Sequence, residues 1–135
     1  MSERTDATGG TAEPTPIDVV AALTYTDGDA DLLIEILAEF AADCPARGRE
    51  LREAVAGGDP PGLARVSHSL KGVLRVIAAG PAAELAQQLE ALGAAGQVSR
   101  ADPVLDRLER ELERIGRFIA DRDAVARAVS RGAGR

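Results

Sequence analysis

The sequence has few of the side chains on which metal sites, disulfides and nucleic-acid surfaces depend. Its 135 residues include one cysteine and one histidine, so no internal disulfide and no cluster of thiolate or histidine ligands can form within one chain. Aromatic residues make up 2% of the sequence, and tryptophan is absent. The formal net charge of −6 argues against a partner such as nucleic acid or an anionic membrane.

Two kinds of targeting segment are also missing from the sequence. It has no long apolar run of the kind that spans a membrane, and its first residues lack the basic start and apolar stretch of a secretory signal. We therefore expect a cytoplasmic, reduced protein. A chain of this length fits one domain that buries roughly two thirds of its unfolded surface. Residues 1–14 have no hydrophobic periodicity, which predicts a disordered N-terminal tail.

From Pro16 onward the spacing of apolar residues is helical throughout, whereas no segment alternates as a strand would. Thr15 is expected to cap the first helix, Asp29 to cap the second, and Pro45 to kink the second helix without ending it. Residues 93–100 are expected to form a loop. The predicted helices cover about residues 15–24, 30–55, 63–78, 81–92 and 102–119.

The short connections between these helices make antiparallel neighbours the simplest packing. The predicted fold is therefore all-α, an antiparallel up-down four-helix bundle with a short extra N-terminal helix, over residues 15–122. Residues 123–135 are expected to be a C-terminal helix extension or a tail.

The helix expected over residues 63–78 contains both His68, the only histidine, and Lys71, the only lysine. At about 100° per residue, the imidazole lies about 160° from the apolar stripe of this helix. His68 and Lys71 therefore share a face that points away from the core. Gly72 lies on the same face, although glycine inside a helix costs about 1 kcal/mol relative to alanine. A missing side chain there predicts that something large approaches the imidazole.

Position along a helical hairpin predicts a partner for each of these side chains. In an antiparallel hairpin that pivots at Ala79, residues equally far from the pivot lie level. Glu90 is then level with His68, and Gln87 with Lys71. A carboxylate at this height can accept from the Nδ1–H group of the imidazole and leave Nε2 nucleophilic.

The stretch His68-Ser-Leu-Lys-Gly72 resembles the H-x-L-K-G signature of histidine-containing phosphotransfer (HPt) domains. The stretch from Gly28 to Phe40, followed by Leu51, Ala54 and Asp59, is similar to the first long helix and turn of that family. Leu89-Glu90 falls where the family often has Leu-Glu. In some members, notably the phosphotransfer domains of chemotaxis kinases, a glutamate at this place orients the histidine. The resemblance covers about residues 18–119.

This resemblance implies a phosphocarrier of a multistep, two-component phosphorelay that is not an autonomous enzyme. His68 would accept a phosphoryl group and exchange it with an aspartate of a response-regulator receiver domain, and a histidine kinase is the other expected partner. Lys71 would neutralise phosphoryl charge, while Gly72, Arg75 and Ala64 would contact the partner. The chain would need no cofactor, because the Mg²⁺ would be held by the receiver domain. It is also expected to act as a monomer.

The sequence also departs from the family pattern and leaves alternatives open. Large residues, Val73, Leu74 and Arg75, follow the motif where the family has small ones, which favours a phosphate-independent adaptor with the same fold. The intact His68, Lys71 and Gly72 count against this alternative. The turn glycine of the family falls at Ala78, so Gly80 is expected to replace it. A third hypothesis is an enzyme that uses His68 and Glu90 as an acid–base pair, which requires a concave pocket.

Two further features are expected to be structural. Cys44 lies on an apolar stripe and is expected to be an inert core residue. The acids and arginines of residues 109–114 are expected to form a solvated face with ion pairs along one helix.

Overall fold

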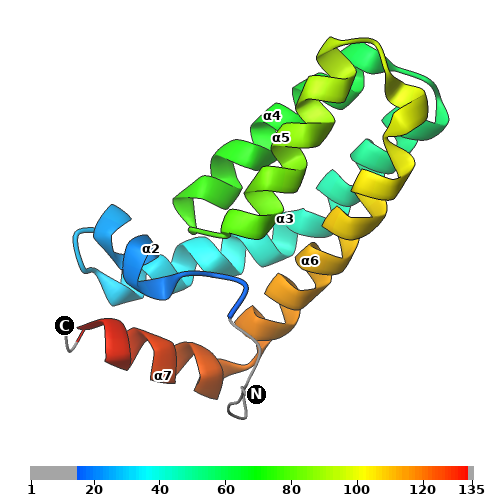
Figure 1. Ribbon diagram of the computed structural model, residues 1–135. Coiled ribbons are helices and arrows are strands. Elements are labelled where there is room, and N and C mark those ends of the chain that lie inside the picture. Colours follow the sequence, from blue (N-terminus) through cyan, green and yellow to red (C-terminus); the bar gives the residue numbers. More distant parts are fainter. Residues whose placement is uncertain (1–14, 134–135) are drawn as a thin grey trace, which may run out of the picture.

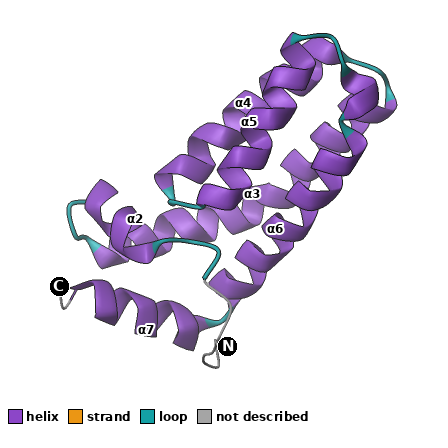
Figure 2. Ribbon diagram, viewed as in Figure 1, coloured by secondary structure: helices purple, strands orange, loops and turns teal. Residues whose placement is uncertain are grey.

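The computed structural model describes residues 15–133, and these residues are helical with short connections and contain no strand (Figures 1 and 2). The disordered tail predicted for residues 1–14 lies outside the described residues. The helices are α2 (Val19–Tyr25), α3 (Ala30–Ala56), α4 (Pro60–Val76), α5 (Gly80–Ala94), the 3₁₀ helix η1 (Val98–Arg100), α6 (Asp102–Ala120) and α7 (Arg122–Ala133).

Helices α3 to α6 form the predicted antiparallel bundle, in which each helix runs opposite to the one before it (Figure 1). Helix α2 is the short extra N-terminal helix. Burial of aliphatic side chains between the helices supplies the main driving force for folding. The fully buried side chains are Ile17, Leu33, Leu37, Leu51, Leu63, Leu70, Leu74, Ile77, Leu89, Leu105, Leu108 and Ile115. Within residues 15–133, no helix is long and apolar enough to cross a membrane.

The predicted cap of the first helix is wrong by three residues. The carboxylate of Asp18 accepts from the Ala21 N–H group at 3.1 Å, so α2 begins at Val19. The Thr15 hydroxyl instead donates to the Ile17 carbonyl at 2.8 Å. Aspartate is a stronger cap than threonine, and here it lies one residue before the helix.

Helix α3 starts and continues as the sequence predicts. Asp29 accepts from the Leu32 N–H group at 3.0 Å, and the helix runs through Pro45 to Ala56. Cys44 is half-buried beside this proline and packs against the core. Burial raises the pKa of its thiol, which keeps the group protonated and agrees with a packing role.

Helix α4 begins at Pro60 rather than at Leu63. Asp59 accepts from the Gly62 N–H group at 3.1 Å, and the two prolines that follow it occupy first-turn positions, where a helix has no use for their missing N–H groups. The sequence predicts one helix break over Gly57–Gly62. In the structure, Asp59 caps α4 and residues 60–62 belong to its first turn.

The turn between α4 and α5 corrects the prediction for Gly80. Helix α4 ends at Val76, and Ala78 takes the left-handed conformation with φ of 58°, while Gly80 is the first residue of α5. The Ala79 N–H group donates to the Leu74 carbonyl at 2.8 Å, and the Ala78 carbonyl accepts from the Asp18 N–H group at 2.9 Å. These bonds hold alanine in a conformation that glycine would adopt at less cost.

Helix α5 extends to Ala94, so Gly93 is helical and not the start of a loop. A Cβ atom at Gly93 would lie 2.7 Å from the Ala64 nitrogen and 2.8 Å from the Pro60 carbonyl oxygen. The glycine therefore lets the last turn of α5 approach the backbone of α4 closely. The rest of the predicted loop contains η1.

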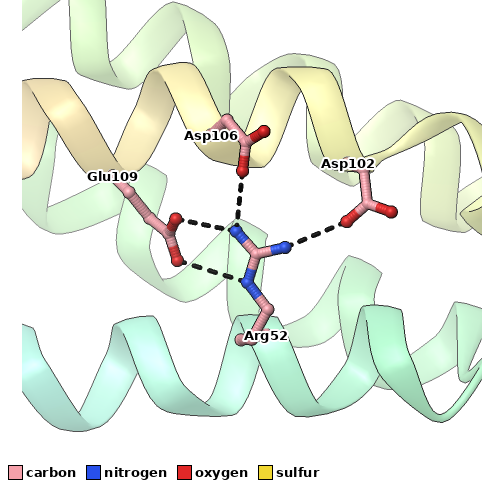
Figure 3. A network of polar contacts seen from close by, with 4 residues as sticks. All are labelled: Arg52, Asp102, Asp106 and Glu109. Carbon is pink, nitrogen blue, oxygen red and sulfur yellow. Dashed lines mark hydrogen bonds and ion pairs between the residues drawn. The ribbon is translucent and has the colours of Figure 1, made fainter.

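A single arginine joins α3 to α6. The Arg52 guanidinium donates to Asp102 at 2.9 Å, to Asp106 at 3.0 Å and to Glu109 at 2.7 Å (Figure 3). The predicted pairing along α6 is present between Glu111 and Arg114. Glu109, however, pairs across helices, which no spacing within α6 could indicate.

The C-terminal segment is a separate helix and not an extension of α6. Asp121 is extended, with ψ of 91°, and its carboxylate accepts from the Ala124 N–H group at 3.0 Å as the cap of α7. Helix α7 turns back and lies beside α2 (Figure 1). Val125 and Ala128 are buried. The few apolar residues of α7 therefore form a packing face, which is covered by α2.

Candidate functional site

Helix α4 presents His68 on the outside of the bundle, as the sequence predicts. Its neighbours Ser67 and Leu70 are buried, whereas 70% of the His68 side chain is exposed. The opposite side of the helix thus anchors α4 in the core. The imidazole contributes little to that packing and is accessible to a partner.

Glu90 of α5 lies level with His68 and contacts it. The distance between His68 Nδ1 and Glu90 Oε2 is 2.9 Å. The pKa of Glu90 is lowered, mainly by the hydrogen bond from Lys71 and further by the one from His68, although burial opposes the shift. An ionised carboxylate can only accept, so Nδ1 donates and the proton-free Nε2 of the neutral ring carries the lone pair.

Lys71 lies against α5 and is largely covered, which differs from the exposed position predicted for it. Only 12% of its side chain is exposed. Its ammonium donates to Gln87 Oε1 at 2.8 Å and lies 2.5 Å from Glu90 Oε1. The predicted level pairs are therefore both present. The long lysine chain reaches sideways to the carboxylate because pairing offsets the cost of covering its charge.

Gly72 has no packing reason to be glycine. It is exposed, and a Cβ atom built on it would meet nothing within 4 Å. A larger side chain would therefore fit the folded chain and would project beside the imidazole. This open space supports the interpretation that Gly72 leaves room for a partner.

The remaining predicted contact residues divide into surface and packing positions. Arg75 is exposed, as a docking residue must be. Ala64 is half-buried, and its backbone contacts Gly93, so part of it belongs to the helix interface. Leu74 is fully buried and Val73 packs against the core. Of the three large residues after the motif, only Arg75 alters the exposed face.

One contact beside His68 could not be found from the sequence. Arg47 of α3 donates from its Nη1 atom to the Ser69 hydroxyl at 2.7 Å. The two residues are far apart along the chain, and neither belongs to the constant positions of the motif. Only the packing of α3 on α4 shows that they meet.

Three sizeable hollows on the described residues are lined by side chains other than the His68 imidazole. One of 630 Å³ is lined by α2, α7 and the α4–α5 turn, and two of 600 and 660 Å³ lie along α3 and α6. His68 and Glu90 line none of these three. The acid–base enzyme hypothesis requires a concave pocket at this pair, and the exposed position of His68 argues against it.

A family model and a crystal structure of known proteins match this chain and share its helical arrangement. The family model of the Hpt domain matches residues 35–118. The crystal structure of histidine-containing phosphotransfer protein B (HptB) from Pseudomonas aeruginosa PAO1 is similar, with a TM-score of 0.74 and 24% sequence identity, over 82% of this chain and 96% of that chain. No curated protein sequence matches the chain.

Proposed function

The chain belongs to the Hpt domain family, and from this premise we propose that His68 is its phosphoacceptor. The family has a phosphotransfer role in multistep phosphorelays and consists of phosphocarriers rather than classical enzymes. The observation that carries the proposal is the exposed imidazole whose Nδ1 atom is 2.9 Å from the Glu90 carboxylate. This arrangement leaves the lone pair of Nε2 directed away from the carboxylate.

The transfer step needs one nucleophile from this chain. The Nε2 lone pair forms a bond to the phosphorus of an aspartyl phosphate, while the bond from phosphorus to the aspartyl oxygen breaks and its electron pair leaves with the carboxylate. The proton stays on Nδ1. The ring becomes cationic as the new bond forms, and the ionised Glu90 stabilises that charge. The reverse reaction returns the phosphoryl group to an aspartate.

Lys71 supports this step from behind the carboxylate. Its ammonium holds Glu90 Oε1 while Glu90 Oε2 remains with His68. Lys71 would also contribute positive charge on this side of the ring, although only 12% of its side chain is exposed. We propose both roles for Lys71, and Gln87 positions its ammonium.

The partners of this family are receiver domains and histidine kinases. We propose that the receiver contributes Mg²⁺ and the acidic residues that bind it, so that the chain itself needs no cofactor and has no autonomous catalytic activity. Every group of the proposed site comes from one chain, which supports action as a monomer. Gly72 and Arg75 lie on the face that a receiver would cover.

The proposal is tested by labelling the chain with a phosphorylated receiver domain and with phosphoramidate, a small phosphodonor. We expect an acid-labile phosphoryl adduct on the wild-type chain and none on His68→Gln, with unchanged thermal unfolding because the side chain is exposed. Equal labelling of His68→Gln refutes the assignment. Failure of the folded wild-type chain to accept a phosphoryl group from either donor favours the phosphate-independent adaptor.

A further inference from the structure

The charges on α4 differ from those of the rest of the chain. The chain carries a net charge of −6, yet the 17 residues of α4 include no aspartate or glutamate. Its cations are Arg65, Lys71 and Arg75. Lys71 is paired with Glu90, whereas Arg65 and Arg75 are exposed and form no ion pair within residues 15–133.

Helix geometry places these two arginines on either side of His68. At about 100° per residue, Arg65, His68, Gly72 and Arg75 fall within about 80° of one another. Arg65 lies about one turn before the imidazole, and Arg75 lies about two turns after it. The exposed strip of α4 therefore has an arginine without an ion pair at each end and the imidazole between them, although Glu50, Glu53 and Asp59 line the same hollow as Arg65.

Arg47 adds a third cation from the neighbouring helix. It is half-buried on α3 and donates to the Ser69 hydroxyl at 2.7 Å. Within the described part of the chain it forms no ion pair, although Glu39 and Asp43 line the same small hollow between α3 and α4. Ser69, next to His68, thus holds the Arg47 guanidinium beside the exposed strip of α4. The guanidinium is bonded to a neutral hydroxyl and not to a carboxylate.

We propose that Arg47, Arg65 and Arg75 form a basic frame around His68 that steers and orients the acidic surface of a receiver domain. This inference rests on the proposed function and adds to it the residues that select the partner. A partner that presents an aspartyl phosphate among acidic metal ligands carries negative charge where this frame carries positive charge. Complementary charge of this kind raises association rates by about 10- to 1,000-fold and suppresses wrong partners.

The test compares two triple variants that change the net charge equally. The frame variant is Arg47→Gln, Arg65→Gln and Arg75→Gln, and the control is Arg107→Gln, Arg110→Gln and Arg117→Gln on α6. The control arginines are exposed and also form no ion pair within residues 15–133. The donor is a receiver domain chosen because its aspartyl phosphate labels the wild-type chain.

We expect the frame variant to accept phosphate from the receiver at least about ten-fold more slowly at low ionic strength, and the control variant within about two-fold of wild type. Added salt should slow the wild-type chain and narrow the difference, since it screens exposed charges. Labelling by phosphoramidate should differ between the frame variant and the control variant by less than labelling by the receiver does, because a small anion is attracted by the frame but needs no docking.

The variant Ser69→Ala tests whether the position of the Arg47 guanidinium matters as well as its charge. It keeps the guanidinium but removes its hydrogen bond, so we expect a measurable loss that is smaller than that of Arg47→Gln alone. Equal rates for the frame variant and wild type, or an equal loss in the control variant, overturn the inference. If neither phosphoramidate nor any receiver domain screened as a donor labels the folded wild-type chain, the proposed function is overturned, and the inference about the basic frame is overturned with it.

Discussion

Replacing Glu90 with glutamine tests whether the carboxylate selects the reactive form of His68. The change keeps the shape of the side chain and removes its charge, and an amide can either accept from or donate to Nδ1. The side chain at position 90 then no longer favours the Nδ1–H tautomer of His68 over the other one. The lost bond is a hydrogen bond to a charged group, which contributes about 1.5–3 kcal/mol when well shielded. With 70% of His68 and 24% of Glu90 exposed, the lower end of that range applies.

A loss of about 1.5 kcal/mol in the transition state corresponds to about a ten-fold slower transfer. The assay is the initial rate of His68 labelling by phosphoramidate, which avoids any change in receiver docking. The single histidine of the chain also gives one imidazole signal set in ¹⁵N spectra. We expect the Nδ1–H tautomer to dominate in the wild-type chain and a mixture of tautomers in Glu90→Gln.

The matched control is Glu84→Gln, which makes the same chemical change at an exposed position of α5. It should leave both the rate and the imidazole spectrum unchanged. A Glu90→Gln chain that labels as fast as wild type and keeps the same tautomer would refute the role assigned to Glu90.

The same substitution has an expected pH dependence of stability. The pKa of Glu90 lies below its ordinary value of 4.5 in the folded chain, so the folded state binds its proton less readily than the unfolded state does. The stabilisation from the ionised carboxylate is fully present above about pH 4.5 and is lost as pH falls through the folded pKa. The stability difference between wild type and Glu90→Gln should therefore shrink in acid.

Three further substitutions test features of the fold and the contact face. Ala78→Gly should stabilise the chain by about 0.5–1 kcal/mol, because it relieves a left-handed alanine at the expense of unfolded-state entropy; Ala79→Gly, at φ of −90°, should destabilise it, and equal effects in thermal unfolding would contradict this reasoning. Arg52→Gln should cost about 1–2 kcal/mol, less at high salt, since each of its ion pairs is partly exposed; a denaturant midpoint equal to that of wild type would show that the network adds nothing. Gly72→Gln should gain up to about 1 kcal/mol of helix stability yet slow transfer from a receiver more than from phosphoramidate, and a stabilised variant with normal receiver transfer would remove the docking role of this glycine.

Much of the bundle could be predicted because its signals are local. Apolar spacing identified the main helices, and Asp29 caps α3 as its position before an apolar run suggests. The pairing of His68 with Glu90 followed from equal distance to the turn, since two antiparallel helices have the same rise per residue.

The features that could not be predicted depend on contacts between distant segments. Ala78 takes a left-handed conformation because Asp18 donates to its own carbonyl and the Ala79 N–H group donates to the Leu74 carbonyl, whereas local preference favours glycine there. The apolar pattern in α7 is too thin to predict a packing face without α2. Arg47 and Arg52 find their partners only after α3 has packed against α4 and α6.

The close contact between Gly93 and the backbone of Ala64 has a mechanical consequence for the chemistry. Glu90 lies less than one turn before Gly93 on the same rigid helix, so the position of α5 along α4 determines whether the carboxylate reaches the imidazole. A side chain at position 93 would push α5 away from α4, because its Cβ atom would already overlap the backbone of α4. Displacing α5 by even a fraction of its pitch of about 5.4 Å would separate an acceptor from a donor that now lie 2.9 Å apart. A substitution at this glycine is therefore expected to weaken the contact between Glu90 and His68, although the altered residue belongs to neither side of that contact.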